Sequence, residues 1–167
     1  MFRLAKEEDI EEIMIIVNDI KTEMKEAGNP QWHEGYPLEV DFLEDVQHQS
    51  LYVYEESHQI VSFMCIQEDT EDDYECVEKR TKQRAYLMHR LGVAPSFRRC
   101  GIAQKFMLYA ESIAKEHGVT LMKADTEVGN EKMNALFLKL GYVFVSTFHW
   151  SDNDGTYKYY EKVLGDE

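Results

Sequence analysis

Apolar residues recur every three or four positions in four segments of the chain, and this spacing predicts helices with one buried face. The four segments are residues 7–27, 39–49, 100–117 and 131–140. In the first, the inward positions are Ile10, Ile13, Met14, Val17, Ile20 and Met24; in the second, they are Val40, Leu43 and Val46. A glycine follows the first, third and fourth segments, as is common where a helix ends.

Shorter runs that are rich in β-branched and aromatic residues predict seven strands. These runs are residues 2–4, 51–55, 60–67, 86–93, 121–126, 142–150 and 157–163. Residues 56–59 join two of them as a hairpin, and residues 151–155 form a clear turn signal before the last. Because strands alternate with helices only in the second half of the chain, the order predicts a mixed α/β sheet with helices on both faces.

The length of 167 residues suits one domain, and we expect a single domain over residues 1–167. Residues 68–84 hold seven acidic residues followed by four basic ones, a pattern that predicts a solvated, mobile loop. No apolar run approaches the roughly 20 residues that span a bilayer, so we expect no membrane association. The acidic N-terminus does not resemble a signal peptide, and we expect a cytoplasmic protein.

The three cysteines lack the spacing of a metal site, so we expect no disulfide framework and no metal. The net charge is −14. Residues 1–85 carry 8 basic and 22 acidic residues, whereas residues 86–167 carry 10 of each. This balance disfavours nucleic-acid binding, which needs a basic face. An acidic surface attracts cations such as amines, although most of these carboxylates are explained by a solvated surface.

The segment after the predicted strand 86–93 carries the most chemical information. There a short loop leads into a long helix, where several backbone N–H groups lack partners and can bind an anion. Arg98 and Arg99 add positive charge, while Gly101 and Ala103 leave the backbone accessible. Neither a Walker loop nor a dinucleotide fingerprint is present. Taken alone, Arg-x-x-Gly-x-Ala also fits a plain helix start with two exposed arginines, and its position between a strand and a long helix is what favours the anion site.

Residues 93–103, Val-Ala-Pro-Ser-Phe-Arg-Arg-Cys-Gly-Ile-Ala, resemble the acetyl-CoA motif of the GNAT superfamily of acyl-CoA N-acyltransferases. That motif reads Gln/Arg-x-x-Gly-x-Gly/Ala. Residues 130–142 are similar to a second family block, an Asn-containing helix that ends in Lys-x-Gly-Phe/Tyr. The predicted element order matches over nearly the whole chain. The resemblance implies a mixed, mostly antiparallel sheet of six to seven strands with helices on both faces.

The resemblance also implies acetyl-CoA as co-substrate. The backbone of Leu91, Gly92 and Val93 would hold the pantetheine arm and the thioester. The loop residues would bind the diphosphate: Arg98, Arg99, Cys100, Gly101, Ile102 and Ala103. Asn130 and Phe137 would lie beside the pantetheine. Asn130 is also a good helix N-cap, and the two roles are compatible.

The implied reaction is N-acetyl transfer by direct attack of a neutral amine on the thioester. The amine needs a base, and His89, which shares strand parity with Leu87, Leu91 and Val93, is our first candidate. A hydrogen-bonded core histidine is an equal alternative for this residue. Glu127 and Asp125 are alternatives, as is water alone. The tyrosine that often serves as acid is replaced by Phe137. Tyr142 and Tyr109 are candidate substitutes, although packing roles are favoured for both. The alternative function is a non-catalytic acyl-CoA sensor or interaction module.

Residues 31–37 follow the first helix, where the family places the acceptor site. Trp32 and Tyr36 would enclose an amine and Glu34 would pair with it. A loop anchored in the core by its aromatic residues is an equal alternative. The expected partner is a small-molecule or peptide amine, and the exposed final strands are compatible with a homodimer.

Overall fold

The computed structural model describes residues 1–151 and 153–165. Its strands form one seven-stranded sheet in the order β1-β2-β3-β4-β5-β7-β6, antiparallel except for the β4–β5 pair. The strands are β1 (Phe2–Leu4), β2 (Leu51–Glu56), β3 (Gln59–Glu68), β4 (Tyr86–Val93), β5 (Leu121–Glu127), β6 (Val143–Phe148) and β7 (Tyr157–Val163). The helices are α1 (Ile10–Ala27), α2 (Glu39–Gln47), α3 (Ile102–Glu116) and α4 (Glu131–Lys139), with short 3-10 turns η1 (Glu7–Asp9) and η2 (Pro95–Phe97).

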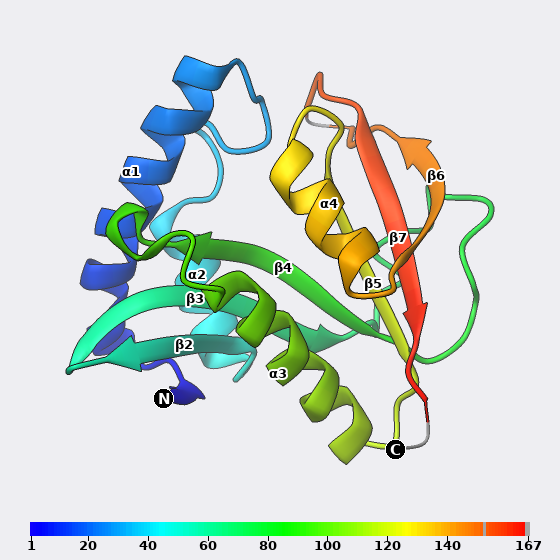
Figure 1. Ribbon diagram of the computed structural model, residues 1–167, viewed down its shortest axis with the longest axis horizontal. Helices are drawn as coiled ribbons and strands as arrows, with labels where there is room; N and C mark the ends of the chain where they lie inside the picture. Colours follow the sequence, from blue (N-terminus) through cyan, green and yellow to red (C-terminus); the bar gives the residue numbers. More distant parts are fainter. Residues whose placement is uncertain (152, 166–167) are drawn as a thin grey trace.

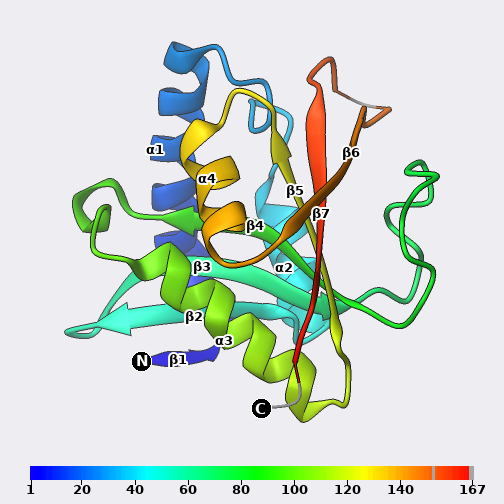
Figure 2. The ribbon, with the colours of Figure 1, turned by 45° about the vertical axis from the view of Figure 1, so that its right-hand side comes forward.

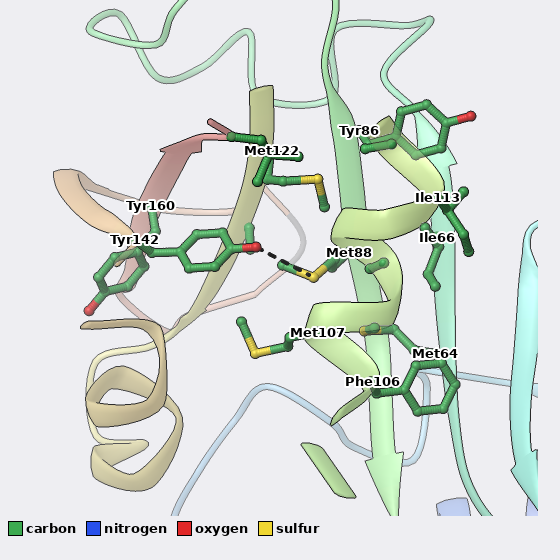
Figure 3. Close-up of a cluster of buried hydrophobic side chains, with 14 of the residues drawn as sticks. Met64, Ile66, Tyr86, Met88, Phe106, Met107, Ile113, Met122, Tyr142 and Tyr160 are labelled. Carbon is green, nitrogen blue, oxygen red and sulfur yellow. Dashed lines mark hydrogen bonds between the residues drawn. The ribbon is translucent and has the colours of Figure 1, made fainter. Parts of the chain in front are cut away.

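Helices cover both faces of the sheet, with α3 and α4 on one side and α1 and α2 on the other (Figures 1 and 2). The core on the α3 side gathers methionines and aromatic residues, including Met64, Met88, Phe106 and Met107 (Figure 3). The core on the α1 side contains Ile, Val and Phe residues from α1, α2, β2 and β3. The predicted α/β fold, its element order and its two helical layers are therefore confirmed.

Helix α2 buries different residues from those that its apolar spacing indicates. Phe42 is fully buried and Asp45 is 4% exposed, whereas Val40 is 53% exposed. The expectation that Val40 points inward is therefore wrong. The buried aspartate is compatible with this position because its carboxylate is paired with an arginine of β4.

Residues 69–84 lie outside the helices and strands, and most of their side chains are exposed, as the loop prediction expects. The prediction did not include two residues that anchor this loop. Tyr74 and Val77 are buried against Leu87 and Tyr159, on the face opposite α3. A buried ion pair joins Lys123 Nζ to Asp69 Oδ2 at 3.2 Å and attaches the segment to β5. Tyr74 and Val77 therefore attach this charged segment to the face of the sheet opposite α3.

The sheet opens between β4 and β5, its two parallel strands. They pair only at Tyr86–Met122 and Leu87–Lys123, and beyond this point they diverge (Figure 1). On its other edge, β4 pairs with β3 through an irregular register, because Phe63 faces Gly92 while Cys65 faces His89. Two residues of β4 therefore stand opposite one of β3, which defines a β-bulge.

Three further observations concern the ends of the chain and its helices. The turn predicted at residues 151–155 includes Asp152, which lies outside the described residues. Strand β6 forms one edge of the sheet, with Val143 and Phe144 exposed, and the predicted homodimer stays a prediction. None of the described helices is both long and apolar enough to cross a membrane.

Candidate active site

The N-terminus of α3 has the backbone geometry of an anion site. Arg99 and Gly101 adopt positive φ angles of 63° and 73° before the helix begins at Ile102. Within the described part of the chain, no backbone N–H from 99 to 104 donates a hydrogen bond to a protein acceptor. A Cβ at Gly101 would meet nothing within 4 Å, so the loop faces open space. Free N–H groups at the positive end of a helix dipole suit a diphosphate.

The side chains of this loop differ in their accessibility. Arg99 and Cys100 are exposed, whereas Ile102 is buried and anchors the helix start in the core. Arg98 forms an ion pair with Glu23 of α1, so part of its charge is already compensated. The backbone N–H groups and Arg99 therefore remain the best-placed groups for phosphate oxygens.

A cavity of about 810 Å³ occupies the opening between β4 and β5. Its lining comes from both faces of the sheet. Met64, Met88, Met107, Leu91, Met133 and Phe137 line it on the α3 and α4 side. Trp32, Tyr36, Asp45, His89, Arg90, Asp73 and Asp125 line it toward α2 and the 68–84 segment. Figure 3 shows Met88 and Met107 within the cluster on the first side, where Tyr142 Oη points toward Met88 Sδ at 4.0 Å.

His89 lies at the cavity wall beside two carboxylates. Its Nε2 is 3.4 Å from Asp73 Oδ2, a distance typical of an ion pair, and has no hydrogen-bond partner among the described residues. The contact with His89 holds the pKa of Asp73 below its usual range. Burial raises the pKa of Asp125, whose oxygens accept hydrogen bonds from Tyr74 Oη (2.5 Å) and Trp150 Nε1 (3.3 Å).

The bulge in β4 changes which side chains share a face. His89 keeps the side of Leu87, but Leu91 packs into the cluster on the α3 side. The expectation that His89 and Leu91 share a face is therefore wrong, because a bulge breaks the alternation of a strand. Arg90 joins His89 on the α2 side instead, where its Nε and Nη2 contact Asp45 at 2.8 and 2.5 Å.

Other candidate acid and base residues lie away from the cavity lining. Glu127 accepts a hydrogen bond from the Gly129 N–H at 2.7 Å and so closes the turn after β5. Tyr142 Oη donates to Glu111 at 3.1 Å in the core, and Tyr109 stacks on Phe2. Of the sequence candidates for proton transfer, the structure brings His89 and Asp125 to the cavity and leaves these three outside its lining.

The loop before α2 places its three predicted acceptor residues differently. Trp32 lines the cavity but is 4% exposed and packs near Phe63 in the core. Tyr36 also lines the cavity, and its hydroxyl accepts a hydrogen bond from Arg90 Nη1 at 3.0 Å. The side chain of Glu34 is 97% exposed, lies 4.0 Å from Lys25 and is not part of the lining.

Helix α4 brings two predicted cofactor residues to the cavity. Asn130 lines it and also caps the helix, because its side chain accepts from the Met133 N–H at 3.3 Å. Phe137 is 2% exposed and packs against Tyr142 and Tyr160. Asn134, which the sequence reasoning missed, holds the start of the helix to the carbonyls of Glu127 and Val128. The second family block thus forms one wall of the opening.

A bulged β4 that diverges from β5 thus leads into a helix whose first N–H groups have no acceptor among the described residues, so an open strand and an anion site are adjacent. The model of the acetyltransferase (GNAT) family matches residues 14–142. The chain therefore belongs to the GNAT family of acyl-CoA-dependent acetyltransferases. No curated protein shows significant sequence similarity to it.

Solved structures support the same fold. A GNAT-family acetyltransferase from Streptococcus agalactiae superposes with a TM-score of 0.86 at 24% identity, over 99% of this chain and 96% of that one. A protein from Salmonella typhimurium solved with its cofactor acetyl-CoA gives 0.73 at 15% identity, over 100% and 95%. A ribosomal-protein-alanine N-acetyltransferase from Brucella melitensis gives 0.72 at 20% identity, over 98% and 99%.

Proposed function

We propose that this protein transfers the acetyl group of acetyl-CoA to the amine of a cationic acceptor. The observation that carries the proposal is the cavity at the β4–β5 opening. On the side of α3 and α4, the cavity is lined by α4 and by a stretch of β4 that is not paired with β5. On the side of α2, His89 lies among carboxylates. A thioester and an amine can therefore meet at β4 from opposite faces of the sheet.

We place acetyl-CoA along the chain from β4 to the start of α3. The diphosphate binds the N–H groups of residues 99–103, and the pantetheine arm lies along Leu91, Gly92 and Val93. Asn130 and Phe137 face it from α4. Support comes from the divergence of β4 and β5, which leaves this stretch of β4 without pairing to β5. Further support comes from the Salmonella typhimurium protein of similar fold, which was solved with its cofactor acetyl-CoA.

The acceptor half of the proposal rests on charge. Among the described residues that line the cavity, one is an arginine and six carry carboxyl groups. The six are Glu44, Asp45, Glu68, Glu71, Asp73 and Asp125. Arg90 and Asp45 neutralise each other, and Glu68 is paired with Arg84, so the excess negative charge rests on the other four carboxyl groups. An acceptor with its own carboxylate, such as a free amino acid, would meet repulsion. An amine with further positive charge would be attracted and concentrated.

The chemistry then needs a base and an oxyanion donor. His89 takes the proton of the incoming ammonium, and ionised Asp73 stabilises the imidazolium that forms. The neutral amine attacks the thioester carbonyl, whose oxygen becomes an oxyanion close to the backbone N–H groups of β4. The tetrahedral intermediate expels the thiolate of CoA. Because a free thiol has a pKa near about 8.5, the thiolate leaves without an acid at the position of Phe137.

The test combines binding with turnover. We expect acetyl-CoA to raise the melting temperature, and we expect free thiol to appear with spermidine or putrescine faster than with glycine, glutamate or a neutral peptide. Turnover of amino acids at equal rate would contradict the cationic acceptor. Binding of acetyl-CoA without thiol release from any amine in the panel would favour the alternative, a non-catalytic acyl-CoA sensor. Absence of binding would overturn both.

A further inference from the structure

Arg90 has an unusual backbone conformation for its residue type and place. It lies within β4, yet its φ is 49°, in the left-handed region that favours glycine. The register of β3 passes from His89 directly to Gly92, and the register of β5 ends at Leu87. Among the described strands, Arg90 and Leu91 therefore have no register partner on either side. A strained arginine at such a point implies that its side chain is required there.

The side chain of Arg90 ties three elements together. Nε and Nη2 form a fork with the carboxylate of Asp45 on α2, and Nη1 donates to Tyr36 Oη in the loop before α2. Both side chains of the fork are largely removed from water, with 16% of Arg90 and 6% of Asp45 exposed. The end of α2 is fixed in turn, because Ser50 N and Oγ donate to the Asp45 carbonyl at 2.9 and 3.2 Å.

We propose that Asp45 is a positioning residue that holds Arg90 in its left-handed conformation and thereby sets the β4 bulge that receives the thioester. The fork is planar and bidentate, so it fixes the direction of the guanidinium as well as its place. Rotation of Arg90 toward ordinary strand geometry would return Leu91 to the α2 side and close the bulge. This inference rests on the proposed function, since it assigns the bulge to acetyl-CoA.

The decisive experiment reads the bulge directly, without an acceptor. Backbone amide NMR shifts of Leu91 and Gly92 are compared with CoA and with acetyl-CoA bound, in the wild type and in Asp45→Asn. We expect an acetyl-dependent shift in the wild type that Asp45→Asn loses. The same variant is expected to lower kcat at least 10-fold while the Kd of CoA, which is set at α3, changes less than threefold. Arg90→Ala, which lacks the fork and for which the left-handed φ is strained, should behave alike.

The matched control is Asp9→Asn. Asp9 forms an equivalent fork with Arg3, at 2.7 and 2.9 Å and with 9% of its side chain exposed, but it lies outside the cavity lining. It should lose stability while it keeps both the acetyl-dependent shift and kcat. An unchanged shift and kcat in Asp45→Asn, or in Arg90→Ala if the first variant does not fold, would overturn the positioning role. No acetyl-dependent shift in the wild type would instead refute the placement of the thioester in the proposed function.

Discussion

Gly92 is required by packing, independently of any role in cofactor binding. It faces Phe63 across the β3–β4 pair, and a Cβ built on it would lie 2.3 Å from Cζ and 2.7 and 2.9 Å from the two Cε atoms of that ring. The ring cannot move aside easily, because Phe63 is fully buried and packs edge-on against Phe42 at 5.3 Å. Gly92→Ala should therefore force the β4 backbone or the ring out of place.

The expected loss for Gly92→Ala is at the upper end of the overpacking range, about 3 kcal/mol. For a chain of this length, it corresponds to a fall in melting temperature of roughly 6–12 °C. The assay is urea unfolding of the protein without cofactor, so that weaker CoA binding does not contribute. Gly165→Ala is the control, since its Cβ would meet nothing within 4 Å and its φ is not positive. It should change stability by less than about 0.5 kcal/mol.

A second substitution isolates the contact. Leucine lacks all three ring atoms that the new methyl group would meet, so Phe63→Leu removes the clash. The double variant should be more stable than the sum of the two single losses predicts, by about 1 kcal/mol or more. Additive losses, or a Gly92→Ala protein as stable as the wild type, would refute the packing argument.

Three further predictions follow from the site and the core. Gly101→Glu should weaken acetyl-CoA binding roughly 100-fold through repulsion of the diphosphate, whereas Gly28→Glu, with a similar φ of 70° and equally open surroundings, should not; equal Kd values would refute the anion site. His89→Gln should lower kcat/KM about 100-fold or more at pH 7 and progressively less at higher pH, where the amine is already neutral; a constant deficit would exclude His89 as base. Burial, reinforced by Glu111, raises the pKa of Tyr142, so its stability contribution is present below pH 10 and is lost as pH rises. Tyr142→Phe should therefore flatten the alkaline fall in unfolding free energy by about 1.4 kcal/mol per pH unit, and an unchanged slope would contradict this.

The elements of this fold are readable from the sequence because their signals are local. Apolar spacing, glycines after helices and a turn signal are properties of neighbouring residues, and they place every described helix and strand within about three residues of its observed bounds. The anion site is readable for the same reason, since one contiguous loop and helix start supply it. The burial of Tyr74 and Val77 is not local, because it depends on Leu87 and Tyr159 from other strands.

The cavity wall toward α2 and the 68–84 segment was not predictable, because single residues from separate elements build it. Asp45 looks like an ordinary polar position of α2, and only its partner 45 residues later accounts for its burial. Asp125 and Glu127 share strand parity, so the sequence offers no reason to choose between them. The structure distinguishes them, because the Gly129 N–H donates a hydrogen bond to the Glu127 carboxylate within the turn, whereas Asp125 lines the cavity.

The charge of the cavity has two opposing effects on an amine acceptor. Carboxylates attract the ammonium form, but the same field raises the pKa of the amine and opposes the loss of its proton. A cavity that only concentrated cations would therefore slow the chemical step. In the proposed mechanism His89 offsets this effect, because it lies where β4 meets the cavity and Asp73, 3.4 Å away, would stabilise its protonated form. In the proposed mechanism, capture of the cation and removal of its proton fall to different residues, so an acidic cavity and a histidine base are compatible in one site.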